Sequence, residues 1–202
     1  MIRHYAEVMD DRARMLSELR GVLAEVGSDH ALVGGLAVGH HGRQRATIDV
    51  GLLVPRAKLR HIGTALEGRG YRVVRTEDML RVHAAGGGEG DEAIADLVAK
   101  DANPVLRAAF EATEPATILG QPVKVVQRGA LVALKFHAAA SPTRQHADRL
   151  QDVVDIERVI SKRFEPADAA LARRIAALAH PGAEHELDRL LDDLRHGRPV
   201  TI

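Results

Sequence analysis

The 202 residues include 28 basic and 28 acidic side chains, and this zero net charge excludes a bulk electrostatic attraction to nucleic acid. The absence of cysteine excludes disulfides and thiolate metal sites, while 46% hydrophobic residues is typical of a folded globular chain. No apolar run approaches the roughly 20 residues that a membrane span needs, and the first residues include His, Glu and Asp where a signal peptide is apolar. We therefore expect a soluble, cytoplasmic protein with no membrane partner.

The chain begins with an expected amphipathic helix over residues 5–26, in which apolar residues recur at helical spacing. Residues 31–33 then predict a short buried strand, and Gly34 and Gly35 a tight turn into a short helix. Paired glycines after a strand let the backbone approach a ligand, and they leave N–H groups free at a helix start, where phosphate binds well. The alternative for these glycines is an ordinary turn from strand to helix.

A second strand is predicted over residues 47–54, after a polar loop that contains Arg45. Alternation along this strand puts Thr47, Asp49 and Gly51 on one face and apolar residues on the other. A carboxylate on its own is expensive to bury, so we expect Asp49 at an edge that holds water or a metal ion.

The middle of the chain is predicted to continue with short helices and strands. In the strand predicted over residues 93–98, Asp96 shares a face with apolar neighbours, so it is a second carboxylate in an apolar setting. A Gly120-Gln121 pair indicates a two-residue hairpin turn. The expected helices cover residues 55–68 and 104–112, and the expected strands cover residues 71–74, 79–83, 93–98, 116–119 and 122–125.

From residue 128 onward every predicted element is helical, which marks a subdomain boundary. We expect an α/β core over residues 1–127 and a C-terminal helical subdomain over residues 128–202. The fold class that follows is α+β (α/β mixed): a small mixed sheet with flanking helices and a C-terminal helical bundle. No internal repeat interrupts this division.

Charged residues in the helical part have two interpretations each. Lys135 lies in an almost wholly apolar helix, so its ammonium either serves a ligand or extends to the surface. Asp148, Asp152 and Asp155 recur along one stripe of the next predicted helix. Such a stripe is either a solvated face or a set of partners for nearby arginines.

Two stretches of the chain resemble one protein family. The pattern Gly-Gly-x-Ala, then His-Gly, then Arg-x-Thr-x-Asp is similar to nucleotidyltransferase-fold proteins of the AbiEii/MNT type, within the DNA polymerase β-like superfamily. A Lys-bearing helix followed by an Arg and by Asp-x-x-Asp-Ile, here residues 152–156, also resembles that family. The residues that match the first pattern are Gly34, Gly35, Ala37, His41, Gly42, Arg45, Thr47 and Asp49.

This resemblance implies an enzyme that transfers a nucleoside monophosphate from an NTP to an acceptor hydroxyl. The implied acceptor is the 3′ end of a tRNA or a protein side chain, in a toxin–antitoxin pair with a cognate antitoxin protein. Antibiotic-modifying enzymes have the same fold, so a small-molecule acceptor is also open. The resemblance makes Asp49 and Asp96 the catalytic carboxylates and Mg²⁺ ligands. It makes the following residues nucleotide-binding: Gly34, Gly35, Arg45, Thr47, Lys135 and Asp152.

One position departs from the family pattern. The family usually has Asp-x-Asp, two carboxylates that hold Mg²⁺, whereas this chain has Asp49-Val50-Gly51. Glycine at this position removes a ligand and a negative charge, and with them several kcal/mol of transition-state stabilisation in a two-metal site. Three explanations are open: an enzyme of reduced activity with one metal ion, an inactive pseudoenzyme that binds a nucleotide or a partner, or an inactivating substitution introduced into a toxin.

Overall fold

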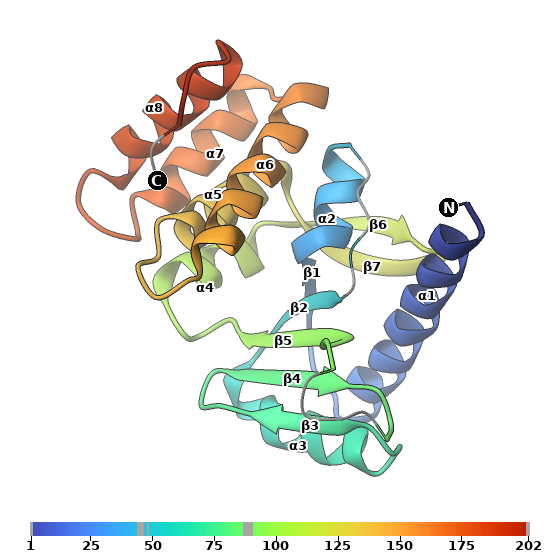
Figure 1. Ribbon diagram of the computed structural model, residues 1–202. Helices are drawn as coiled ribbons and strands as arrows, with labels where there is room; N and C mark the ends of the chain where they lie inside the picture. The colour runs from blue at the N-terminus through green and yellow to red at the C-terminus, as the bar shows by residue number, and fades with distance from the viewer. Residues whose placement is uncertain (1, 44–46, 48, 87–90, 201–202) are drawn as a thin grey trace. The chain divides into compact units, whose positions relative to one another are not determined.

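The computed structural model describes residues 2–43, 47, 49–86 and 91–200, with side chains from residue 10 onward. The described part of the chain forms eight helices and a seven-stranded mixed sheet (Figure 1). The α+β fold expected from the sequence is therefore confirmed. The helices are α1 (Ile2–Glu25), α2 (Gly34–His41), α3 (Arg56–Glu67), α4 (Pro104–Glu111), α5 (Arg128–Ala139), α6 (His146–Lys162), α7 (Pro166–Ala176) and α8 (Ala183–Arg195).

The sheet has the strand order β3-β4-β5-β2-β1-β7-β6. At its centre β2 lies parallel to β5 and antiparallel to β1, and β1 is parallel to β7. On the other side, β4 joins β5 and β3 in antiparallel pairs. The strands are β1 (Ala31–Val33), β2 (Val50–Val54), β3 (Arg72–Arg75), β4 (Met79–His83), β5 (Ala95–Ala99), β6 (Thr113–Ile118) and β7 (Gln121–Val126).

Several predicted boundaries move in the structure, among them the start of β2 and the turn of the last hairpin. The strand expected from residue 47 begins at Val50, because Asp49 lies in a bend. The two-residue turn of the last hairpin is formed by Leu119 and Gly120, and not by Gly120 and Gln121. Both turn residues have positive φ, +50° and +72°, as a turn that follows the twist of a hairpin requires.

The chain divides into two compact units. The first contains Met1–Leu36, Arg45–Ala102 and Glu114–Val125, and the second contains the remaining segments. In the first unit, α1 and α3 contact one face of the sheet, where alternate residues of β2 and β5 are fully buried. Val50, Leu52 and Val54 of β2 pair there with Ala95, Leu97 and Ala99 of β5. The opposite face of β2 and β5 carries Gly51 and Asp96, followed by the apolar pair Leu53 and Val98.

The second unit is a bundle in which α5 contacts α4, α6 and α7, and α7 contacts α8 (Figure 1). The sequence of α5 is apolar on nearly every side, and most of its residues are buried. Gly129 lets α5 approach α7 closely, because a Cβ at this position would collide with the carbonyl oxygen of Asp168. The C-terminal helical bundle expected from the sequence is present.

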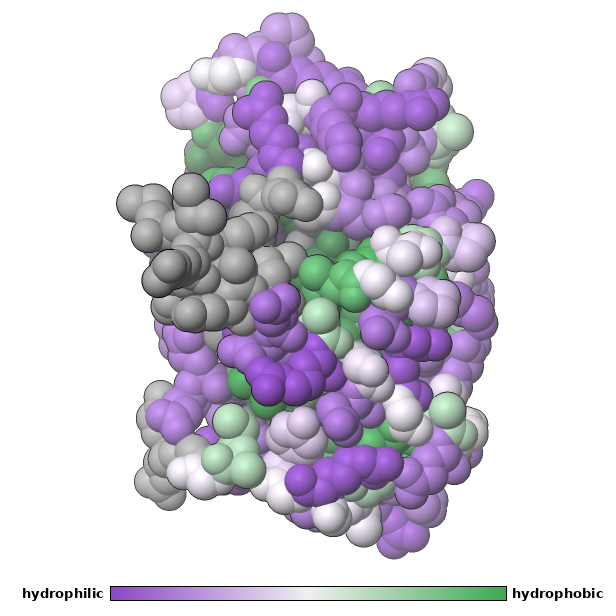
Figure 2. Space-filling model, turned by 90° about the vertical axis from the view of Figure 1, so that its right-hand side faces the viewer, coloured by the Kyte–Doolittle hydropathy of each residue, from purple (hydrophilic) through white to green (hydrophobic). Residues whose placement is uncertain are grey.

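Large apolar side chains are rare on the surface of the described residues. Those that are exposed are Val74 on β3, Leu150 and Val154, which are one turn apart on α6, and Leu178 after α7. The face drawn in Figure 2 has polar side chains over most of its area, with smaller apolar areas between them. Among the described helices, none combines the length and the apolar character of a membrane span.

Candidate functional site

Two acidic residues lie on the polar face of the central strands. The parallel register of β2 and β5 sets Gly51 level with Asp96, and Asp49 precedes Gly51 by two residues. Alternation places Gly51 and Asp96 on one side of the sheet, and Asp49, in the bend before β2, lies near enough for its charge to act on Asp96. We call Asp49, Gly51 and Asp96 the carboxylate face. Burial raises the pKa of Asp96 above its ordinary value, and the negative charge of Asp49 raises it further. The two carboxylates are near enough to repel each other.

An arginine that the sequence analysis missed also lies on the carboxylate face. Arg81 of β4 pairs in register with Asp96, and its Nε donates a hydrogen bond to Asp96 Oδ1 over 3.2 Å. This guanidinium opposes the effect of burial and lowers the pKa of Asp96. Alternation of Met79, Arg81 and His83 along β4 was visible in the sequence, but the pairing of β4 with β5 was not.

The carboxylate of Asp49 is held from its own loop. Thr47 is buried, and its Oγ1 donates a hydrogen bond to Asp49 Oδ1 over 3.1 Å. Arg12 of α1, also buried, donates from Nε to the carbonyl oxygen of Thr47 over 3.3 Å. Arg12 is a second residue that the sequence analysis missed, because its partner lies 35 positions further along the chain.

The glycine turn lies beside the carboxylate face. Helix α2 begins at Gly34, two residues before the expected Leu36, and Gly34 has φ +70°, which favours glycine. A Cβ on Gly34 would lie 3.7 Å from the Cα of Gly51. The free N–H groups of the first turn of α2, which includes the buried Gly35, therefore start next to the strand that carries Asp49.

Gly51 can accept a side chain only with a small adjustment. Its φ is not positive, so the backbone suits any residue. An ideal Cβ would lie 3.3 Å from the carbonyl oxygen and 3.4 Å from Cγ2 of Val33. Contacts of this length require Val33 to move by a few tenths of an ångström.

The two helical residues expected to bind a nucleotide lie together in the second unit. Lys135 Nζ is 2.8 Å from Asp152 Oδ1 and 2.8 Å from Asp155 Oδ2. The side chains of Asp152 and Asp155 are only 1% and 0% exposed, so these two residues do not form a solvated face. We call Lys135, Asp152 and Asp155 the buried cluster. Arg45, the remaining expected contact, lies outside the described residues.

Two arginines also contact the carboxylates of the buried cluster. Arg144 Nε is 2.7 Å from Asp152 Oδ2, and Arg158 Nη1 is 3.3 Å from Asp155 Oδ1. Gln151 Nε2 also donates to Asp155 Oδ1 over 3.0 Å. The two buried carboxylates thus have three cations around them, and the cluster joins α5 to α6.

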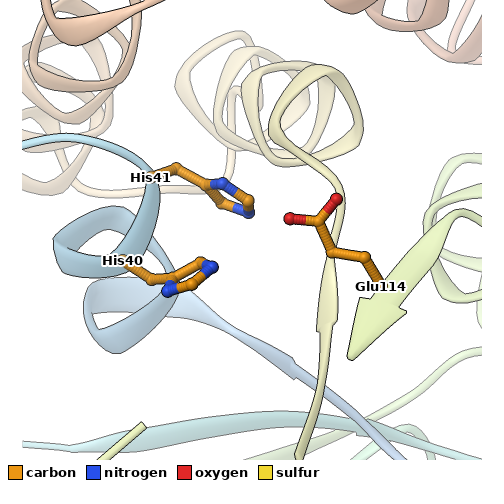
Figure 3. A group of neighbouring side chains, drawn as sticks. All are labelled: His40, His41 and Glu114. Carbon is orange, nitrogen blue, oxygen red and sulfur yellow. The ribbon is translucent and has the colours of Figure 1, made fainter. Parts of the chain in front are cut away.

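The His-Gly pair at the end of α2 has a structural role in the second unit. His41 is buried, and its Nε2 is 2.7 Å from the carbonyl oxygen of Val126. A Cβ on Gly42 would collide with the backbone of Arg158, so glycine allows α2 to approach α6. The rings of His40 and His41 meet edge to face, with centroids 4.8 Å apart (Figure 3). Glu114, also drawn there, belongs to the first unit, and we assign no metal site to this group.

Comparisons with known proteins identify the fold. No family model matches the chain, and no curated protein matches its sequence. An antigenic nucleotidyltransferase-like protein from Paracoccidioides brasiliensis has a similar structure, with TM-score 0.57 and 17% identity, over 92% of this chain and 93% of that one. ANT(2″)-Ia in complex with adenylyl-2″-tobramycin has TM-score 0.57 and 16% identity, over 82% of this chain and 97% of that one.

A solution structure of the antibiotic-resistance factor ANT(2″)-Ia is similar to the same degree, with TM-score 0.56 and 15% identity, over 92% of this chain and 97% of that one. Identities this low show the fold and leave the activity to the residues of the site. The chain has a nucleotidyltransferase fold.

Proposed function

We propose that this protein transfers a nucleoside monophosphate from an NTP to an acceptor hydroxyl, at a site with one divalent cation. The observation that carries the proposal is the register of β2 and β5, which sets Asp96 level with Gly51, while the charge of the nearby Asp49 acts on Asp96. The start of α2 lies next to the same position of β2. Carboxylates for a cation and N–H groups for phosphate are therefore adjacent.

The donor set fits a single Mg²⁺ ion. Magnesium prefers carboxylate, phosphate and water oxygens, and it is commonly held by one or two protein carboxylates together with substrate phosphates. Asp49 and Asp96 supply two carboxylates, while Gly51 replaces the second carboxylate of the family's Asp-x-Asp pattern. When bound, the ion would neutralise triphosphate charge and polarise the phosphorus that is attacked.

The side chains of the carboxylate face have distinct parts in this proposal. The acceptor oxygen bonds to the α-phosphorus, and the bond to the bridging oxygen breaks, so pyrophosphate leaves with that electron pair. Asp96, whose pKa is raised by burial, is suited to receive the proton of the hydroxyl. Thr47 fixes the orientation of the Asp49 carboxylate, and Gly34 and Gly35 present N–H groups to the phosphates.

For Lys135 and Asp152 we propose a supporting part. Their ionic contacts join α5 to α6, and Lys135 already has two carboxylate partners. A lysine in this position is suited to positioning its helix, and it would contact a phosphate only by giving up a buried partner. Arg45 remains a predicted phosphate contact.

The acceptor is proposed by class. The AbiEii-type motifs favour the 3′ end of a tRNA or a protein hydroxyl, in a toxin–antitoxin pair with a cognate antitoxin. The similarity to ANT(2″)-Ia, described in complex with adenylyl-2″-tobramycin, favours a small-molecule hydroxyl instead. Screening should cover both the macromolecular acceptors and the small-molecule acceptors with each NTP, because the zero net charge of the chain gives no bulk preference for RNA.

Titration calorimetry tests the site directly. ATP, GTP, CTP and UTP are titrated with Mg²⁺ into the protein and its Gly51→Asp variant, with Gly51→Ala as the control that adds a Cβ without a charge. We expect one NTP to bind the unmodified chain and to bind Gly51→Asp more tightly, with no gain in Gly51→Ala. Release of pyrophosphate in the acceptor screen is expected to rise in parallel.

Two other outcomes have clear meanings. Nucleotide binding without pyrophosphate release in either chain would indicate the alternative function, a pseudoenzyme that retains the pocket. Gly51 favours this alternative, because it removes a ligand that the two-ion reaction uses. Absence of NTP binding in all three chains would contradict the proposed function.

A further inference from the structure

Arg81 is a permanent cation on the carboxylate face, and it is only partly engaged. Among the described residues its guanidinium has one partner, Asp96, reached through Nε over 3.2 Å. The side chain is 50% exposed, while that of Asp96 is 27% exposed. A guanidinium has five N–H donors, and its terminal pair matches two oxygens of a phosphate. Most of the donor capacity of Arg81 is therefore available.

The position of Arg81 in the sheet places it in one row with the proposed site. Arg81 on β4 is level with Asp96 on β5, and Asp96 is level with Gly51 on β2. Neighbouring strands lie about 4.8 Å apart, so the row from β4 to β2 spans about 10 Å. The start of α2, where phosphate is expected, is next to Gly51 at the far end of this row.

The charges of the row make Arg81 and a divalent cation competitors. Asp49 and Asp96 contribute two negative charges, and Arg81 neutralises one of them through Asp96 Oδ1. A cation bound between the two carboxylates uses Asp96 as well, so it weakens the ion pair with Arg81. The released guanidinium then stands beside the phosphates that the cation brings.

We propose that Arg81 is a triphosphate-binding residue of this site, which Asp96 holds until a divalent cation takes its place. Arg81 thereby supplies positive charge to the phosphates that a second metal ion supplies in a two-ion site. This inference rests on the proposed function, because it needs a divalent cation at Asp49 and Asp96. It also explains how the site could work without a carboxylate at position 51, because one ion and one arginine together replace the two ions.

The test measures cation binding and phosphate binding separately, without any acceptor. Mn²⁺ alone is titrated by electron paramagnetic resonance, and inorganic tripolyphosphate with Mg²⁺ is titrated by calorimetry, which avoids any dependence on the base. The variants are Arg81→Gln and Arg81→Lys. Arg75→Gln is the matched control, because Arg75 also pairs with a carboxylate, Glu67, on the surface of the same unit.

We expect Arg81→Gln to bind Mn²⁺ about threefold more tightly, because an exposed competing ion pair is lost. We expect it to bind tripolyphosphate about tenfold more weakly, because a bidentate charged contact is lost. Arg81→Lys should recover part of the phosphate affinity, and Arg75→Gln should match the unmodified chain in both titrations. The Lys variant keeps the test valid if Arg81→Gln fails to fold.

The contrary outcomes separate the two proposals. Tighter Mn²⁺ binding with unchanged tripolyphosphate binding would overturn the phosphate role, and so would Mn²⁺ binding that weakens in Arg81→Gln. If the unmodified chain binds both ligands and Arg81→Gln behaves identically, the inference about Arg81 fails and the proposed function stands. If no variant, Gly51→Asp included, binds Mn²⁺, the proposed function itself fails.

Discussion

The carboxylate face and the buried cluster each contain two aspartates, but the aspartates differ in burial and in the number of their cationic partners. Asp152 and Asp155 are fully buried and are surrounded by Lys135 and two arginines. Asp49 and Asp96 are partly accessible and repel each other, and Arg81, with a smaller contribution from His83, opposes that repulsion. Buried charges that are fully paired support the fold, while accessible charges that are incompletely paired can bind a ligand.

The largest expected effect is the loss of stability when a carboxylate of the buried cluster is removed. Asp155→Asn leaves Lys135 and Arg158 with one fewer buried partner, and breaking such a pair costs about 3–5 kcal/mol. Chemical denaturation measures the loss. The control is Asp148→Asn, an exposed aspartate on the same helix, which should change the stability little. A loss of the same small size for Asp155→Asn would show that the cluster does not hold the helices together.

The next effect concerns the backbone beside the carboxylate face. Gly34→Ala forces a Cβ into a left-handed conformation and should cost about 1–2 kcal/mol. Gly21→Ala is the control, because Gly21 lies inside α1 with open space around it and normal helical geometry. That variant should instead gain about 0.5–1 kcal/mol. Equal effects of the two substitutions would contradict the conformational argument.

Asp96→Asn makes the same substitution on the carboxylate face that Asp155→Asn makes in the buried cluster. It should change the free energy of unfolding by no more than about 0.5 kcal/mol. The pKa of Asp96 is raised in the folded state, so its protonated form stabilises the fold at low pH. This stabilisation is lost as pH rises through the folded-state pKa. At neutral pH the amide of Asn removes the cost of burying a charged carboxylate, and this gain offsets the lost contact with Arg81. Thermal unfolding measures the result.

Divalent cation binding should follow the same titration. Asp96→Asn is expected to abolish Mn²⁺ binding, and affinity in the unmodified chain should fall as pH is lowered through the raised pKa of Asp96. Electron paramagnetic resonance across a pH series measures this fall. Binding that is independent of pH down to the ordinary aspartate value of 3.8 would place the cation elsewhere.

The smallest expected effect is a dependence of stability on pH at His30, just before β1. Its ring nitrogens are buried, close to the backbone of Ser28. Burial lowers the pKa of His30 below 6.5, and this effect exceeds the opposite effects of the Ser28 backbone and the charge of Asp29. The neutral ring of His30 therefore stabilises the fold above pH 6.5, and this stabilisation is lost as pH falls through the folded-state pKa.

Denaturation at pH 7.5 and 5.5 measures the contribution of His30 as a difference between chains. The unmodified chain should lose up to about 1 kcal/mol more than His30→Gln over this interval. His185→Gln, which changes an exposed histidine on α8, is the control and should keep the slope of the unmodified chain. An identical slope in His30→Gln would show that this ring does not titrate with folding.

Much of the candidate site follows from local rules of the sequence. Alternation places Asp49 and Gly51 on one side of a strand, and the glycine pair marks the start of a helix after a strand. Strand alternation likewise identifies Asp96 as a second carboxylate among apolar residues. These patterns have short periods, so they need no knowledge of which strands are neighbours.

The pairing of strands and helices determined the rest. Arg81 reaches Asp96 because β4 and β5 are neighbours, and Arg12 reaches Thr47 because α1 lies near a loop 35 residues away. Asp152 and Asp155 of α6 are buried beside Lys135 of α5, while Asp148 of the same stripe is exposed. The sequence by itself determined which residues share a face of one element. Only the tertiary structure decided which faces meet, because charges pair across segments whose separation along the chain carries no periodic signal.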